Sequence, residues 1–236
     1  MKEFIGELIG TFLLIYMGTG VVAGVLLKGT KSNSSGWLVV TLGWAFALLI
    51  AIYFAGALSG AHLNPAVTIA LALIGKFESS KIWIYIFAQF LGAIAGAIAT
   101  YVHYYPHWAA TEDKDAKLAV FSTAPAIKNI VSNFSSEFLA SFILMFGLMA
   151  IGSNQFALGL NPLIIALLII SIGLSLGGTT GWAINPARDL GPRIAHYLLP
   201  IPGKRDSNWT YAWIPVVAPI AGCISGAFFY QFIINL

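Results

Sequence analysis

The stretch SGAHLNPAVT at residues 59–68 decides how this chain folds, together with TGWAINPARDLGPR at residues 180–193. Both stretches contain an Asn-Pro-Ala box, made of Asn64, Pro65, Ala66 and of Asn185, Pro186, Ala187. Asn is a preferred helix N-cap, and Pro is favoured at the first helical position. Each box therefore predicts the start of a helix.

The helices that follow the boxes are too short to cross a bilayer. At 1.5 Å per residue, residues 65–75 make a helix of about 16 Å, roughly half of a ~30 Å hydrocarbon core. Residues 185–197 form the matching second segment. A half-length helix enters and leaves a membrane on the same side, so each box is expected near the midplane. Irregular backbone at that depth is tolerated only where it is buried in protein or lines a water-filled cavity.

The composition of the chain indicates that most of its surface faces lipid. Of 236 residues, 58% are hydrophobic and only 9% are charged, whereas a soluble domain has about 25% charged residues. The net charge of +3, without a basic cluster, gives no indication of nucleic-acid binding. The single cysteine, Cys223, permits no intrachain disulfide.

Six segments are long and apolar enough to span a bilayer. They are residues 4–27, 37–56, 81–103, 135–153, 161–178 and 211–234. Six crossings place both termini on one side, although the Lys/Arg count, taken alone, would place that side outside. The long linker 104–133 is predicted to carry a solvated charge run and nothing more, made of Glu112, Asp113, Lys114, Asp115 and Lys117.

The two halves of the chain repeat each other. Glu7-Leu-Ile-Gly-Thr-Phe recurs as Glu137-Phe-Leu-Ala-Ser-Phe, and the first box recurs as the second. Three spans precede the second half, so it enters the membrane from the opposite face and the repeat is inverted. We therefore expect one transmembrane domain over residues 1–236, with repeats at about 1–103 and 134–236. The two half-helices should meet N-terminus to N-terminus.

Both boxes, in the forms SGAHLNPAVT and TGWAINPARDLGPR, resemble the aquaporin superfamily of major intrinsic proteins, and the resemblance covers essentially the whole chain. It implies an all-α membrane protein with six tilted helices and two re-entrant half-helices, assembled as a homotetramer with one pore per subunit. It also implies a multi-pass place in the plasma membrane with cytoplasmic termini. The unwound residues resemble those whose carbonyls line the pore in this family: Gly60, Ala61, His62, Gly181, Trp182 and Ala183.

The resemblance also implies a selectivity filter, the narrowest point of the pore. Carried over by spacing, it consists of Trp44, Gly173, Trp182 and Arg188. Water-selective members have His where Gly173 stands, so Gly173 is expected to leave room for a carbon chain. Two aromatic faces would offer an apolar corner, and Arg188 would donate to hydroxyls. Further residues that resemble the glycerol-conducting branch (aquaglyceroporins, or glycerol uptake facilitators) are Asp189, Arg193, Pro215 and Val216.

One position departs from the better-known glycerol facilitators, which have Phe or Tyr where Trp182 stands. The departure leaves open which small solute passes best: glycerol, dihydroxyacetone, urea or protonated lactic acid. Tryptophan is also enriched at membrane interfaces. We assign Trp37, Trp83 and Trp209 to such a belt, and Trp44 and Trp182 to the pore.

The midplane predicted from the two boxes is expected to repel cations. Each helix N-terminus carries about half a positive charge, and here two would face each other. The amides of Asn64 and Asn185 can donate hydrogen bonds to a passing oxygen. A water that accepts from both cannot remain part of a continuous donor chain, which interrupts proton hopping.

Glu7 and Glu137 are carboxylates inside apolar spans, where an uncompensated charge costs ~3 kcal/mol or more. One hypothesis makes them the proton relay of a transporter. The other, favoured by their symmetric placement, is that each accepts hydrogen bonds from the N–H groups of a re-entrant loop. His62 has no metal-ligand partner at suitable spacing, so packing or bracing of the backbone is expected, and no metal or cofactor is predicted.

The sequence therefore predicts a passive channel for glycerol, other small uncharged solutes and water that excludes ions and protons. The first alternative is a facilitator mainly for another small neutral solute. A proton-coupled secondary transporter is the second, because such transporters also use inverted repeats and broken helices. No nucleophile–base pair or metal cluster points to a membrane enzyme.

Overall fold

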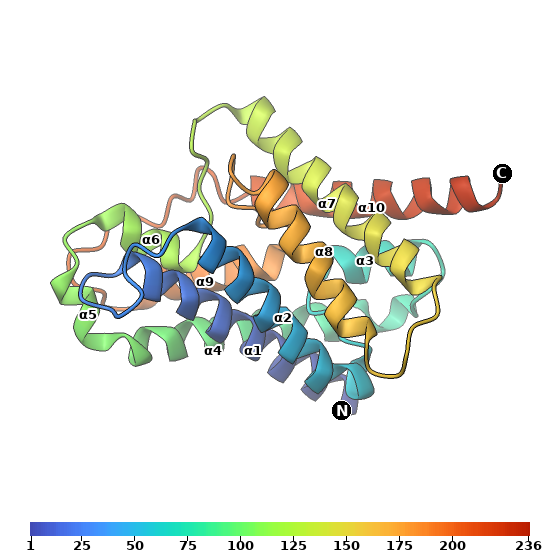
Figure 1. Cartoon of the computed structure of the whole chain (residues 1–236), viewed down its shortest axis with the longest axis horizontal. Helices are drawn as coiled ribbons and strands as arrows, with labels where there is room; N and C mark the ends of the chain where they lie inside the picture. Colours follow the sequence, from blue (N-terminus) through green and yellow to red (C-terminus); the bar gives the residue numbers. More distant parts are fainter.

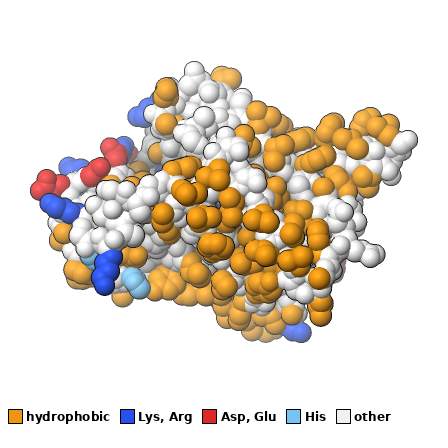
Figure 2. Space-filling view, in the orientation of Figure 1, with side chains coloured by type: hydrophobic (Ala, Val, Ile, Leu, Met, Phe, Trp, Pro, Cys, Tyr) orange, Lys and Arg blue, Asp and Glu red, His pale blue; other side chains and the backbone are white.

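Long apolar helices make up most of the chain, as the hydropathy pattern predicts. The computed structural model describes residues 1–236 and contains ten α-helices, one short 3-10 helix η1 (Ser79–Lys81) and no strand. Five segments are long and apolar enough to cross a membrane: α1 (Lys2–Leu26), α2 (Trp37–Ser59), η1 with α4 (Ile82–His103), α7 (Ile130–Gly152) and α10 (Ile214–Ile234). Figure 2 shows hydrophobic side chains over the middle of the molecule, with charged ones gathered mainly at its left end.

The sixth apolar helix is shorter than the predicted span 161–178. α8 (Asn161–Leu176) has 16 residues, which corresponds to about 24 Å. It stops at Gly177 and Gly178, where the chain turns toward the second box, because glycine is a poor helix former. α8 packs against α2 and α7 and completes the set of six long apolar helices.

Both predicted half-helices are present. They are α3 (Pro65–Leu73) and α9 (Pro186–Leu198), so α3 ends two residues earlier than expected. Each begins with its Asn cap: the Asn64 side chain accepts from Ala66 N at 2.9 Å, and Asn185 accepts from Ala187 N at 3.0 Å. In Figure 1 α3 lies toward the right and α9 toward the left, with both helices packed against α4 and α10.

Glycines bring the long helices together in the same way in both halves. A Cβ on Gly92 of α4 would lie 2.2 Å from the Leu8 carbonyl oxygen of α1. The equivalent Cβ on Gly222 of α10 would lie 2.3 Å from the Phe138 oxygen of α7. Such close backbone approach through small residues is typical of helix packing in membranes.

The linker 104–133 is more than the solvated charge run that the sequence predicts, although Glu112, Asp113, Lys114 and Asp115 are exposed. The linker contains α5 (Tyr105–Ala110) and α6 (Lys114–Phe121), and α6 packs against α1 and α9. Trp108 and Phe121 are fully buried and stacked, with ring centroids 5.4 Å apart. Even Lys117 is buried, and its Nζ donates to the Pro202 carbonyl. The charged residues of the segment obscure, in the sequence, the apolar face that α6 buries against the rest of the protein.

The glycine crossings predict a local cost for added volume. Gly92→Ala should lower the stability of the folded protein by about 1–3 kcal/mol, because its methyl group meets backbone that cannot rotate away. Thermal unfolding in detergent would measure the loss. Gly20→Ala is the matched control, since nothing lies within 4 Å of that Cβ. Equal stability of the two variants would show that the α1–α4 crossing tolerates a wider spacing.

Candidate functional site

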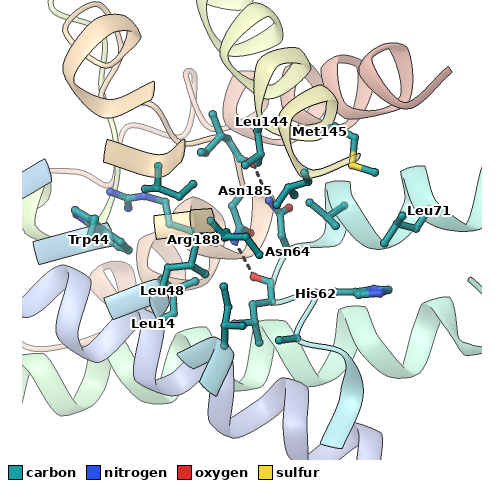
Figure 3. Close-up of a pocket in the computed structure, with 18 of the residues that line it drawn as sticks. Leu14, Trp44, Leu48, His62, Asn64, Leu71, Leu144, Met145, Asn185 and Arg188 are labelled. Atoms are coloured by element: carbon teal, nitrogen blue, oxygen red, sulfur yellow. Dashed lines mark hydrogen bonds between the residues drawn. The ribbon is translucent and has the colours of Figure 1, made fainter. Parts of the chain in front are cut away.

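Two cavities lie next to each other inside the helix bundle and share three lining side chains. The central cavity has a volume of about 240 Å³, contains both Asn residues and is lined by 22 residues, 17 of them hydrophobic. The second cavity, which we call the vestibule, has about 390 Å³ and lies beside Trp37 and Thr123. Trp44, Trp182 and Arg188 line both cavities, so they stand at the junction. In Figure 3 Trp44 and Arg188 lie to the left of the two Asn residues, with His62 and Leu71 to the right.

Trp44 and Arg188 contact each other directly at this junction. The Arg188 Cζ atom lies 3.9 Å from the centre of the Trp44 ring, within cation–π distance. The guanidinium makes no side-chain hydrogen bond within the chain, and its Nη1 is buried without a partner. Nε and Nη2 also have no partner in the chain and are not buried, so they are the donors left for a solute in the pore.

A glycine of α1 makes room for Trp44. A Cβ on Gly18 would lie 2.2 Å from Cζ3 of the Trp44 ring and 2.3 Å from Cε3. Any side chain at residue 18 would therefore push the indole out of its place. No motif in the sequence points to Gly18, because the contact joins two helices and follows no local pattern.

The expectation that Gly173 leaves room for a carbon chain is wrong in its geometry. Gly173 lines neither cavity. A Cβ there would lie 2.7 Å from the Thr41 methyl group and 3.1 Å from Cζ2 of Trp182. The space that the missing side chain leaves is filled by the Trp182 indole. Gly173 therefore acts on the junction through Trp182, which lies against α8.

The two boxes are joined by a pair of reciprocal hydrogen bonds. Asn64 Nδ2 donates to the Ile184 carbonyl at 2.8 Å, and Asn185 Nδ2 donates to the Leu63 carbonyl at 2.8 Å; dashed lines in Figure 3 mark both bonds. Each amide oxygen also caps its own half-helix. A primary amide has two N–H donors, so each Asn keeps one for the cavity.

The unwound residues before each box repeat one backbone conformation. Gly60, Ala61 and Leu63 have positive φ angles of 82°, 55° and 52°, and Gly181, Trp182 and Ile184 follow with 88°, 38° and 44°. Non-glycine residues adopt such angles at a cost of about 1–3 kcal/mol each. Six carbonyls of these segments accept no hydrogen bond from the chain: those of Gly60, Ala61, His62, Gly181, Trp182 and Ala183. They supply unpaired acceptors to the two cavities.

Glu7 and Glu137 receive the N–H groups of the same segments. Glu7 accepts from His62 N at 2.9 Å, from Leu63 N at 2.7 Å and from Ser59 Oγ at 2.6 Å. Glu137 accepts from Ala183 N at 2.9 Å, Ile184 N at 3.0 Å and Thr180 Oγ1 at 2.6 Å. Both residues are fully buried and line neither cavity. The geometry is that of loop bracing, and nothing places either carboxylate on a solute path.

Gln89 is a further member of the first bracing group. Its Nε2 donates to Glu7 at 2.7 Å and to Thr68 Oγ1 at 3.1 Å. His62 lies beside it, with Nδ1 3.1 Å from the same hydroxyl and the ring packed on Phe77 and Tyr85. His62 thus packs against two aromatic rings and also lines the central cavity.

Asp189 and Arg193 of α9 form a buried ion pair. Arg193 Nη2 lies 2.7 Å from Asp189 Oδ1 and also donates to the Thr123 carbonyl. Asp189 Oδ2 accepts from both N and Oγ1 of Thr123 at 2.7 Å. The pair thus fixes the linker against α9, with Thr123 in the vestibule wall. Pro215 and Val216, at the start of α10, line neither cavity.

Comparison with known proteins identifies relatives over the whole length of the chain. Residues 1–230 match the family described as Major intrinsic protein. The chain is 58% identical to the glycerol uptake facilitator protein of Bacillus subtilis, over 98% of this chain and 84% of that protein. It is 54% identical to a probable glycerol uptake facilitator of Thermotoga maritima, over 99% and 100%. The structure of the aquaglyceroporin from Plasmodium falciparum superposes with a TM-score of 0.88 at 33% identity, covering 99% of this chain and 96% of that one.

The position of Gly18 predicts a selective effect on the junction. In Gly18→Ala the added methyl group displaces the Trp44 ring toward the pore. Glycerol flux should then fall by about tenfold relative to water flux, which corresponds to a barrier for glycerol that is about 1.4 kcal/mol higher. Light scattering on proteoliposomes measures both fluxes, and Gly20→Ala again serves as the control. An unchanged flux ratio would mean that Trp44 yields in another direction.

If Glu137 only braces the loop, its replacement should lower the stability of the folded protein. It should not affect any dependence of transport on a proton gradient. In Glu137→Gln an NH₂ group replaces one acceptor oxygen and faces a buried donor, which should cost about 1–3 kcal/mol. Thermal unfolding measures this cost, with Glu112→Gln as an exposed control. All solute fluxes should fall together with the amount of folded protein. A stable variant that loses only gradient-driven uptake would support the proton-relay hypothesis instead.

Proposed function

The chain belongs to the major intrinsic protein family, a family of membrane channels, and we propose that it conducts glycerol, other small uncharged solutes and water passively. The chain is a multi-pass membrane protein and not an enzyme. Its relatives of known description are named as glycerol uptake facilitators. The proposal extends their solute to this chain.

One observation carries the choice of solute: the junction of the two cavities is amphipathic. Two indoles form one side of it, and the buried guanidinium of Arg188 forms another. Glycerol has carbons along one edge and hydroxyls along the other, so it can face the rings and the donors at the same time. Aromatic faces favour CH₂ groups, and the guanidinium fork favours oxygen acceptors.

The same arrangement supports exclusion of cations and protons. A cation at the junction meets the charge of Arg188, and at the boxes it meets the positive ends of α3 and α9. The free amide donors of Asn64 and Asn185 orient a water through its oxygen. We propose that the unpaired carbonyls of residues 60–62 and 181–183 then pass hydroxyl donors along the pore.

Assembly and placement form part of the proposal. We propose a single channel domain over residues 1–236, made of two inverted repeats and joined by the linker 104–133. Large apolar side chains are exposed on the outer faces of the helices, among them Phe87 and Phe232, and lipid or neighbouring subunits can cover them. The family resemblance supports a homotetramer in the plasma membrane with cytoplasmic termini.

Reconstitution tests the proposed function. Proteoliposomes carrying the protein should reswell in glycerol faster than empty liposomes, with no applied gradient of protons or sodium and no loss of an imposed proton gradient. Dihydroxyacetone, urea and lactic acid at low pH should be measured beside glycerol to rank the solutes. Uptake that needs a proton or sodium gradient would contradict the channel.

Trp182 predicts where this chain differs from facilitators with a smaller ring. Its indole lies against Gly173, and a phenyl ring would leave part of that space empty. Trp182→Phe should therefore raise the flux of four-carbon polyols relative to glycerol, by about two- to fivefold, while water flux changes little. A polyol series on both proteins measures the ratio. An unchanged ranking would remove Trp182 from the selectivity filter.

A further inference from the structure

Trp37, at the start of α2, contacts two of the filter positions although it belongs to neither box. Its indole Nε1 donates to the Gly173 carbonyl at 3.1 Å. Its ring meets the Trp182 ring edge to face, with centroids 4.8 Å apart and planes at 79°. Both residues line the vestibule. Trp37 is therefore more than the interfacial belt residue that its sequence position predicted.

The two indoles meet over one glycine of the α8 terminus. A Cβ on Gly177 would lie 2.4 Å from Cε3 of Trp182 and 2.9 Å from Cζ2 of Trp37. The Trp182 ring thus has α8 on one side, at Gly173 and Gly177, and Trp37 at its edge. The open side of the ring faces the pore.

Packing alone fixes the Trp182 ring. Of the two indoles, only that of Trp37 donates a hydrogen bond within the chain. Trp182 also belongs to an unwound segment, with a φ of 38°, so no helix holds its backbone. Edge-to-face contact is a favoured arrangement of aromatic rings. Without Trp37, the Trp182 ring has free space on the vestibule side into which it can turn.

We propose that Trp37 is a positioning residue that sets the size limit of the pore by holding the Trp182 indole against α8. The inference rests on the proposed function, because the size limit is read from polyol flux. Trp37 itself stands in the vestibule, and solutes pass the junction beyond it. Its Nε1 also donates a hydrogen bond to the Gly173 carbonyl in the last turn of α8. This bond fixes the Trp37 ring relative to the end of that helix.

Removal of the Trp37 ring tests the proposal. In Trp37→Ala the ratio of four-carbon polyol flux to glycerol flux should rise by about two- to tenfold, the equilibrium factor that one edge-to-face aromatic pair is worth. Trp37→Phe keeps a ring edge but loses the N–H donor, so its ratio should lie between those of Trp37→Ala and the native protein. Stopped-flow light scattering on proteoliposomes measures both fluxes on the same preparation. A flux ratio does not depend on how much protein is incorporated.

Trp209→Ala is the matched control. Trp209 is 44% exposed, against 42% for Trp37, and it packs on Tyr197 away from both cavities. Its removal should leave the flux ratio unchanged. If Trp37→Ala does not reach the membrane, Trp37→Leu, which keeps apolar volume without a ring, takes its place under the same criterion.

A ratio that stays at the native value in Trp37→Ala or Trp37→Leu would overturn the proposal, and Trp37 would then be an anchor of α2 only. The proposed function is judged separately on the native protein. If native protein fails to conduct glycerol, the channel proposal itself fails. If it conducts and the ratio does not move, only the role of Trp37 is lost.

Discussion

The backbone of residues 60–63 and 181–184 must find hydrogen-bond partners deep inside a membrane protein, and the rest of the structure depends on how it finds them. A polar backbone group left without a partner in such an interior costs several kcal/mol. The N–H groups of residues 62, 63, 183 and 184 all donate to two buried carboxylates. The carbonyls of Leu63 and Ile184 accept from the Asn side chain of the opposite box. Each half therefore completes the other, and neither box is fully paired alone.

The N–H groups of these segments are mostly paired, whereas most of their carbonyls are not, and this difference sets which polar groups face the cavities. Because the N–H groups point to Glu7 and Glu137, the unpaired groups that remain at residues 60–62 and 181–183 include six carbonyls, which are acceptors. The two Asn amides at the centre and the Arg188 guanidinium at the junction supply donors. A solute with hydroxyl groups can donate to the carbonyls of residues 60–62 and 181–183. It can accept hydrogen bonds at two places, the boxes and the junction. At the same two places a hydrated cation meets the positive ends of α3 and α9 and the guanidinium of Arg188, which repel it.

The features that the sequence predicted are those with a local or repeated signal. Both half-helix starts and their Asn caps are confirmed, as are the apolar helices, because capping and hydropathy act over a few residues. The packing of the linker and the space next to Gly173 were predicted wrongly. Both depend on contacts between distant segments: Phe121 on Trp108, and Gly173 on Trp182. The contacts of Gly18 with Trp44 and of Trp37 with Trp182 carried no sequence signal for the same reason, since each joins two separate segments.

The junction depends on the same kind of contact between distant segments. Each of its two indoles lies against glycine from another helix: Trp44 on Gly18 of α1, and Trp182 on Gly173 of α8. The aperture is therefore set by where α1 and α8 stand as much as by the rings themselves. Those helices are held in turn by the close crossing of α1 with α4 and by the packing of α8 on α2 and α7. The space that Gly173 leaves on α8 is what accommodates the Trp182 indole. A side chain at Gly18, which itself lines neither cavity, would displace a ring that lines both.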